Sequence, residues 1–196
     1  FGVPIDRADI EKCKRTGDAN NDWLVTQNIL AKNGVYPAFE DIKACFEGVY
    51  WGTGTTPGLC LNETLIGDRD ALLRLAHRVP IAAVTGRPRR DALYVLERFG
   101  ILNAFSAVVT MEDGPAKPHP APVHQAMATL GVQRAWMVGD TRDDIVAARA
   151  ADVLPLGVIS PGTQDPDLTR KHLLNQGAAR VFKNWMEMEA LLSCTF

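Results

Sequence analysis

The chain has 196 residues, of which 46% are hydrophobic and 22% are charged, and its formal net charge is −2. This composition is typical of one folded domain, or of one domain with a small insert. The nearly balanced charge gives no electrostatic basis for binding nucleic acid or an anionic membrane surface, and no apolar run is long enough to span a bilayer.

The cysteines give no sign of a metal site or a disulfide framework. They are scattered, without a Cys-x-x-Cys pair, at Cys13, Cys45, Cys60 and Cys194. This pattern suits a reducing compartment, so we expect a cytoplasmic protein. A targeting segment removed from the N-terminus stays compatible with this expectation, because the chain begins at Phe1 and not at Met.

Residues 1–64 are predicted to form a helical unit. Helical periodicity covers residues 7–34 with a polar break at 16–22, where Asp22 is predicted to cap the second helix. A third helix is expected over residues 38–50. The glycine-rich run at 51–58 has no Gly-Lys-Ser/Thr ending and no clear preceding strand, so it is predicted to be a flexible hinge and not a phosphate-binding loop.

From Asp68 onward, helical and strand patterns alternate. The expected helices span residues 69–78, 89–99, 121–130 and 144–151, and the expected strands span 81–84, 107–110, 135–138 and 154–158. Residues 180–182 are expected to add an edge strand, and 185–192 a closing helix. The alternation predicts right-handed crossovers and an α/β fold with a doubly wound parallel sheet.

Two carboxylates follow the apolar run at 135–138, which is predicted to be a short buried strand. Asp140 comes directly after Gly139, and Asp144 lies four residues later at the start of the next helix. The end of a parallel strand is where α/β sheets place ligands, and a carboxylate pair suits Mg²⁺. The alternative is that Asp143 and Asp144 only stabilise the positive end of the helix.

Two further segments carry groups that suit an anion. Thr85-Gly86 follows the strand at 81–84, and a hydroxyl and backbone N–H groups at such a position can bind phosphate. Arg87 follows, and with its neighbouring arginines it is interpreted as an anion-binding rim. Lys117 is displayed from a stiff proline-rich loop. Each feature alone is typical of a turn or a solvated charge, but their order along the chain is informative.

In that order, the residues resemble the haloacid dehalogenase (HAD) superfamily, specifically its phosphatase branch with a helical, C1-type cap. Thr85 matches the second motif of that family, Lys117 the third, and Asp140 with Asp144 the fourth. The resemblance covers about residues 65–196. It implies a HAD-like Rossmannoid core over residues 65–196 and a cap over residues 1–64.

The resemblance also implies a chemistry, the Mg²⁺-dependent hydrolysis of a small phosphorylated metabolite through an aspartyl-phosphate. Thr85, Gly86, Arg87 and Lys117 would bind the phosphate, Asp140 would hold Mg²⁺, and Asp144 would help to place the ion. In the cap, Asn20 and Asn21 would contact the leaving group. The alternative for these asparagines and the neighbouring Trp23 is a helix cap beside a core tryptophan.

The first motif of the family, Asp-x-Asp-Gly, which supplies the nucleophile, is absent from this chain. Asp6-Arg7-Ala8-Asp9 lacks the glycine and follows no buried strand, so it is not a substitute. We therefore expect a chain that lacks the first strand of its sheet and is almost inert by itself. Either its own N-terminal strand completes a phosphatase, or the chain is a non-catalytic module whose sheet a partner segment fills. A dehalogenase or a phosphomutase is a third option.

Overall fold

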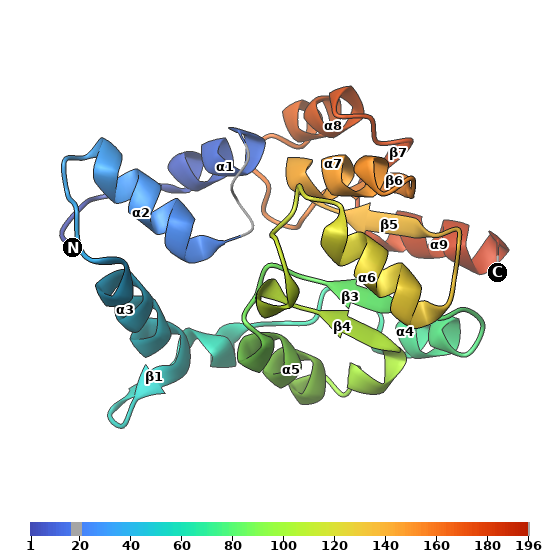
Figure 1. Cartoon of the computed structure of the whole chain (residues 1–196), viewed down its shortest axis with the longest axis horizontal. Helices are drawn as coiled ribbons and strands as arrows, with labels where there is room; N and C mark the ends of the chain where they lie inside the picture. The colour runs from blue at the N-terminus through green and yellow to red at the C-terminus, as the bar shows by residue number, and fades with distance from the viewer. Residues whose placement is uncertain (17–20, 196) are drawn as a thin grey trace.

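A computed structural model describes residues 1–16 and 21–195 (Figure 1). Its first three elements are the helices α1 (Arg7–Thr16), α2 (Asp22–Lys32) and α3 (Phe39–Trp51). Asn21 caps α2, since its side chain accepts the N–H groups of Trp23 and Leu24. Asparagine is among the preferred residues at this position. The cap therefore lies one residue before Asp22, which was predicted to provide it.

Aromatic contacts hold α2 against α3. The Trp23 ring lies edge-on to Phe39 and Phe46, with centroid separations of 6.3 and 6.4 Å. The segment predicted to be a flexible hinge contains a small antiparallel hairpin, β1 (Gly52–Thr53) and β2 (Thr56–Pro57), followed by the 3₁₀ turn η1 (Leu59–Asn62). Gly52 is required there, because its φ is +81° and a Cβ would lie 2.4 Å from the Thr56 carbonyl oxygen.

The rest of the chain alternates helices with strands, which confirms the predicted α/β fold. The elements are α4 (Arg69–Ala76), β3 (Ala82–Val84), α5 (Arg89–Arg98), η2 (Leu102–Ala104), β4 (Ala107–Val109), η3 (Met111–Asp113), α6 (Ala121–Leu130), β5 (Trp136–Gly139), α7 (Arg142–Ala150), β6 (Leu154–Val158), α8 (Pro166–Asn175), β7 (Arg180–Phe182) and α9 (Trp185–Thr195). The helix α8 was not predicted, although Asp165 caps it and Pro166 opens its first turn.

The parallel strands form two separate ladders. In one, β3 pairs with β4, and in the other the order is β5-β6-β7. Among the described residues, β3 and β5 do not pair with each other. In Figure 1, β5 lies above β3 and α6 passes in front of both. The expected doubly wound sheet is therefore interrupted between β3 and β5.

The strand β5, which lies beside this interruption, is unusually exposed. Trp136 and Val138 on β5 are 39% and 37% exposed, so β5 is not the fully buried strand that its apolar run predicted. Met137 points to the other face and packs against the apolar cluster around Ala147 of α7. The free edge of β5 has no neighbouring strand among the described residues, and one face of this strand carries the two exposed side chains.

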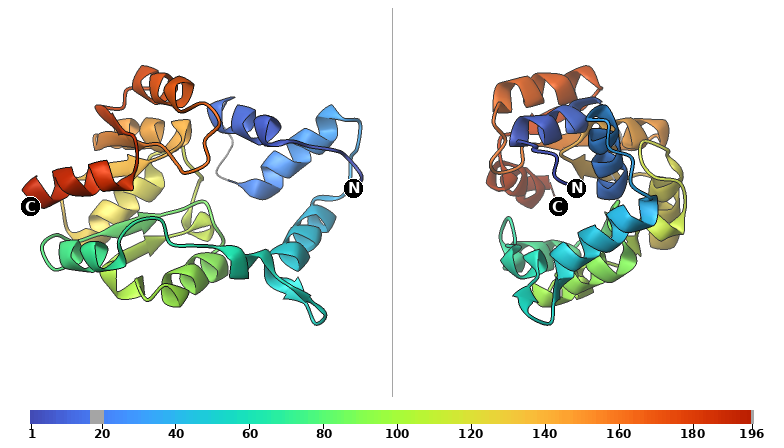
Figure 2. Two further views of the ribbon diagram at one scale, coloured as in Figure 1. Left: turned by 180° about the vertical axis from the view of Figure 1, so that it is seen from behind. Right: turned by 90° about the vertical axis from the view of Figure 1, so that its left-hand side faces the viewer.

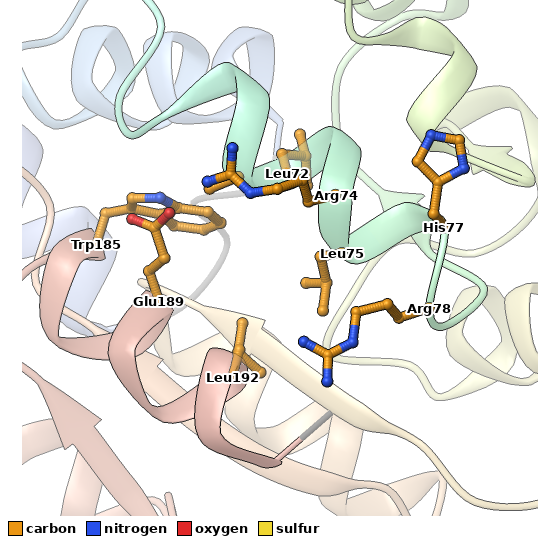
Figure 3. Close-up of a pocket in the computed structure, with 9 residues that line it drawn as sticks. Leu72, Arg74, Leu75, His77, Arg78, Trp185, Glu189 and Leu192 are labelled. Carbon is orange, nitrogen blue, oxygen red and sulfur yellow. The ribbon is translucent and has the colours of Figure 1, made fainter.

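A cavity of about 330 Å³ lies between α4 and α9 (Figure 3). In Figure 3, Leu75 and Leu192 point into it from the two helices, and Trp185 closes one end. Gly67 allows that closure, because a Cβ there would lie 2.4 Å from the Trp185 ring. The two helices therefore leave apolar side chains without full coverage.

The helices α1, α2 and α3 lie at one end of the molecule, and α9 with the C-terminus lies at the opposite end (Figure 2). Within the described part of the chain, no helix combines the length and the apolar character needed to cross a membrane.

Candidate active site

Lys117 connects the two ladders. Its Nζ donates to the Val84 carbonyl oxygen at 3.0 Å and to Asp144 Oδ1 at 2.5 Å. The side chains of Lys117 and Asp144 are only 8% and 7% exposed. A buried charge needs such partners, so this lysine is not the solvated surface charge that a lone lysine usually is. It joins the end of β3 to the start of α7, across the interruption in the sheet.

Asp144 is fixed from the side of its own helix as well. Its Oδ2 accepts the Thr141 N–H at 3.1 Å and the Thr141 hydroxyl at 2.7 Å, while the Asp144 N–H donates to Thr141 Oγ1 at 3.3 Å. This reciprocal capping box sits directly on Gly139, where a Cβ would lie 2.2 Å from Asp144 Cβ. Asp144 therefore combines the helix-end role with the ion pair to Lys117, and its role at a metal stays a prediction.

Asp140 follows the last residue of β5 and is bound by a residue that the sequence analysis did not single out. The Ser160 hydroxyl donates to Asp140 Oδ2 at 2.5 Å. Ser160 lies just beyond β6, the neighbour of β5, and the rule that ligand sites gather at the carboxyl edge of parallel strands would have drawn attention to it.

The carboxylates suit Mg²⁺, which takes one or two carboxylates and fills its other positions with water and phosphate. They do not form a complete protein cage. Within residues 1–16 and 21–195, no three His, Cys, Asp or Glu side chains gather so that they could enclose a metal ion.

Thr85 is held at the end of β3 with its hydroxyl oriented. Its N–H donates to the Val109 carbonyl oxygen at 2.9 Å, and its Oγ1 accepts the Arg87 N–H at 3.1 Å. Because a hydroxyl that accepts one bond keeps its own proton, Thr85 can still donate to an anion. Gly86 lies inside this turn.

Arg87, predicted to be part of an anion-binding rim, has protein partners. Its Nη1 donates to Glu63 Oε1 and Oε2 at 2.9 and 3.1 Å and to the Tyr50 hydroxyl at 3.2 Å. Burial disfavours the charge of Arg87, but Glu63, Tyr50 and Asp22 together outweigh it and hold the pKa of the guanidinium above its ordinary value. Burial also raises the pKa of the Tyr50 hydroxyl well above its ordinary range. No sequence motif pointed to Tyr50 or Glu63.

A second reciprocal box follows β4. Asp113 Oδ2 accepts the N–H and the hydroxyl of Thr110 at 2.7 and 2.8 Å, and Arg89 binds the same carboxylate. These bonds, that of the Thr110 N–H first, lower the pKa of Asp113. The Asp113 carboxylate is therefore directed to Thr110 and Arg89.

The two asparagines predicted to contact the leaving group, Asn20 and Asn21, have different outcomes. Asn21 serves as the helix cap of α2, which is the alternative weighed against a substrate contact. Asn20 lies outside the described residues. At one edge of the two ladders, the structure thus brings together Val84, Lys117, Gly139 and Asp144.

The chain is similar to several known proteins. Residues 63–158 match the family described as haloacid dehalogenase-like hydrolase, and this range contains Thr85, Lys117, Asp140 and Asp144. A hydrolase from Pseudomonas syringae has a similar fold, with a TM-score of 0.72 at 19% identity over 98% of this chain and 85% of that one.

Two curated relatives are more similar in sequence. A protein of Phytophthora nicotianae named imidazoleglycerol-phosphate dehydratase is 41% identical over 93% of this chain, and a phosphoglycolate phosphatase of Pectobacterium atrosepticum is 36% identical over 71% of it. The chain spans only 41% and 61% of the lengths of these two proteins.

Proposed function

We propose that this chain, which matches the haloacid dehalogenase-like hydrolase family over residues 63–158, hydrolyses a small phosphomonoester when its parallel sheet is complete. The observation that carries this proposal is the buried Lys117, paired with Asp144 at the ends of β3 and β5. A cation held there by the protein meets the negative charge of a phosphoryl group without reorganisation of solvent.

In this proposal, the Thr85 hydroxyl and the Gly86 N–H donate to phosphate oxygens, and Lys117 neutralises the phosphoryl group. Asp144 keeps the ammonium group oriented through their 2.5 Å contact. Asp140 lies at the end of the neighbouring ladder, with Ser160 fixing one of its oxygens. Asn20 and Asn21 are left as candidate contacts to the leaving group.

Asp140 is the residue that would hold Mg²⁺, and Asp144 would help to place the ion. When bound, the ion would neutralise charge on the phosphate oxygens. The donor set supports this assignment because Mg²⁺ needs few protein carboxylates when phosphate and water supply the remaining ligands.

The nucleophile is proposed to come from a further parallel strand between β3 and β5. Both strands have a free edge there, and the exposed side chains of Trp136 and Val138 lie on β5. A strand running parallel to both would end near Lys117, where an aspartate could form the aspartyl-phosphate. The proposal also assigns residues 1–64 to a cap and residues 65–196 to the core.

The names of the relatives suggest substrates to test. One relative is named a phosphoglycolate phosphatase, and the other is named for imidazoleglycerol phosphate. Both names contain small phosphorylated compounds, so these two compounds should head a panel of phosphomonoesters.

The direct test is phosphate release by this chain, alone and within a longer form that includes an added strand ending in Asp-x-Asp-Gly. We expect release only from the longer form, and only with Mg²⁺ present. Lys117→Met in that form should lower phosphate release by at least about 100-fold, whereas Arg74→Met, at the cavity between α4 and α9, should leave it nearly unchanged. Absence of release from the longer form across the panel would refute the proposal.

The interrupted sheet also favours a second candidate function, that of a non-catalytic module completed by a partner strand. This alternative predicts that a bound strand raises the stability of the chain while no phosphate is released. The same samples decide the question, because thermal unfolding and phosphate release can be measured side by side.

A further inference from the structure

One face of α5 holds the segment that leads from α3 into the core. On α5 the residues of this face follow helical spacing, and they are Arg90, Asp91, Tyr94 and Arg98, while Arg87 lies just before the helix. Each of them contacts a residue between positions 50 and 63. This repeated use of one helical face indicates a built seat and not an accidental contact.

The middle of the seat holds Trp51. The Arg90 guanidinium lies over the indole ring, 3.9 Å from its centroid, and the Tyr94 ring packs edge-on at 4.9 Å. The Trp51 side chain is hydrogen-bonded to Asp91, which is only 6% exposed. An aromatic ring held by a cation, a second ring and a hydrogen bond is restricted in position and orientation.

The far end of the seat holds η1 through its backbone. Arg98 donates to the carbonyl oxygens of Cys60 at 2.5 Å and Leu61 at 2.6 Å, with a longer bond of 3.3 Å to that of Glu63. Carbonyl groups at the end of a short 3₁₀ turn lack partners within the turn, and a guanidinium with several donors satisfies them.

The near end of the seat reaches the candidate active site. Arg87 binds Glu63 and Tyr50, and the Tyr50 hydroxyl itself lies 3.1 Å from Glu63 Oε1. The Arg87 N–H donates to Thr85 Oγ1 in the same turn. A shift of Tyr50 or Glu63 is therefore transmitted through Arg87 to the loop that carries the Thr85 hydroxyl.

We infer that Arg87 is a positioning residue that couples the seating of residues 50–63 to the Thr85 loop, and that it is not a ligand of the substrate. Its Nη1 contacts both carboxylate oxygens of Glu63 and the Tyr50 hydroxyl, so the guanidinium is directed toward residues 50–63. The coupling itself stands on contacts within the chain, and only its effect on hydrolysis rests on the proposed function.

A charge exchange between Arg87 and Glu63 tests the coupling. In the full chain, Arg87→Glu and Glu63→Arg should each speed amide hydrogen exchange in residues 50–63 and 85–88 by about fivefold. The double exchange should bring both segments back to within about twofold of the original rates, because the ion pair is restored in reverse. The milder Tyr50→Phe should produce a smaller change in the same two segments.

Arg89→Met is the matched control, because it removes a guanidinium of the same turn whose partner is Asp113. It should leave exchange in residues 50–63 unchanged. If the single exchanges speed only one of the two segments, or if the double exchange restores neither, the coupling is refuted.

Hydrolysis by the longer form separates positioning from substrate binding. We expect the double exchange to restore KM together with the exchange rates. Restored exchange with a KM still raised at least tenfold would assign Arg87 to the substrate and overturn the inference. Absence of hydrolysis in every form, with the exchange coupling intact, would refute the proposed function alone.

Discussion

On the outer strands β4 and β7, Val109 and Phe182 are 3% and 0% exposed, whereas on the inner strand β5, Trp136 and Val138 are 39% and 37% exposed. In α/β sheets the central strands are normally the most buried. In the described ladders β5 is an edge strand, and its exposed side chains are the observation on which the proposed added strand rests. On the outer strands, in contrast, the side chains of Val109 and Phe182 are almost completely buried.

A second contrast concerns the two Thr-x-x-Asp boxes. Each follows a strand, with Thr110 and Asp113 after β4 and Thr141 and Asp144 after β5. The outer box binds the partly exposed Arg89, and the inner box binds the buried Lys117. The same local device therefore serves an ordinary loop in one place and the candidate active site in the other.

The largest effect is expected from Lys117→Met, which breaks the contact between the ladders. It leaves Asp144 buried without its cation, so we expect the free energy of unfolding to fall by about 3 kcal/mol. In the longer form, phosphate release should fall about 100-fold to 1,000-fold. Urea unfolding and a phosphate assay measure the two effects.

Arg180→Met is the control for that change, because it removes an exposed guanidinium from the outer strand β7. It should leave the free energy of unfolding and the rate of phosphate release nearly unchanged. An equal loss of stability in the two variants would show that the Lys117–Asp144 contact contributes no more to stability than an exposed charge on β7.

Gly139→Ala should be the next most disruptive substitution. The new Cβ would meet Asp144 Cβ at 2.2 Å and displace the inner box, at a cost of about 2 kcal/mol. Gly48→Ala is the matched control, since a Cβ at that position would meet no atom within 4 Å and alanine favours the helix α3. Thermal unfolding should show opposite signs for the two variants.

Equal truncations on the two kinds of strand sharpen the contrast. Val109→Ala on β4 should cost about 2 kcal/mol of unfolding free energy, and Val138→Ala on β5 less than about 1 kcal/mol. In the longer form, the second value should approach the first, because an added strand would cover β5. If Val138→Ala costs the same in both forms, no strand fills the interruption.

The smallest effect is a pH dependence at the outer box. The pKa of Asp113 is lowered in the folded chain, so this carboxylate stabilises the fold at neutral pH and loses that contribution as the pH falls below the ordinary aspartate range. Asp113→Asn should therefore destabilise the chain at pH 7 and lose that difference in acid. Chemical denaturation at several pH values, with Asp70→Asn as an exposed control, measures the change.

The local sequence predicted most elements to within two or three residues. The helix Ala121–Leu130 and the strands Leu154–Val158 and Arg180–Phe182 have the predicted bounds, because apolar periodicity and flanking glycines or prolines mark them clearly. The hairpin at 52–57 was not predicted as structure, since strands of two residues carry too little periodicity to recognise.

Within the candidate site, Thr85, Lys117, Asp140 and Asp144 could be named from their order along the chain and their place at strand ends. Ser160 could have been named from its place just beyond the strand at 154–158, whereas Glu63 and Tyr50 could not, because each acquires its partner from a distant segment. The exposure of β5 could not be predicted from the sequence either, because an apolar run predicts burial without specifying which segment buries it.

By itself, the sequence determined the alternation of helices and strands, the α/β class and the groups able to bind an anion, because these depend on local periodicity and on residue chemistry. Only the tertiary structure decided that the sheet is interrupted between β3 and β5, that Lys117 pairs with Asp144, and that Arg87 faces Glu63. Those features depend on which segments become neighbours in space, and long-range packing sets that arrangement.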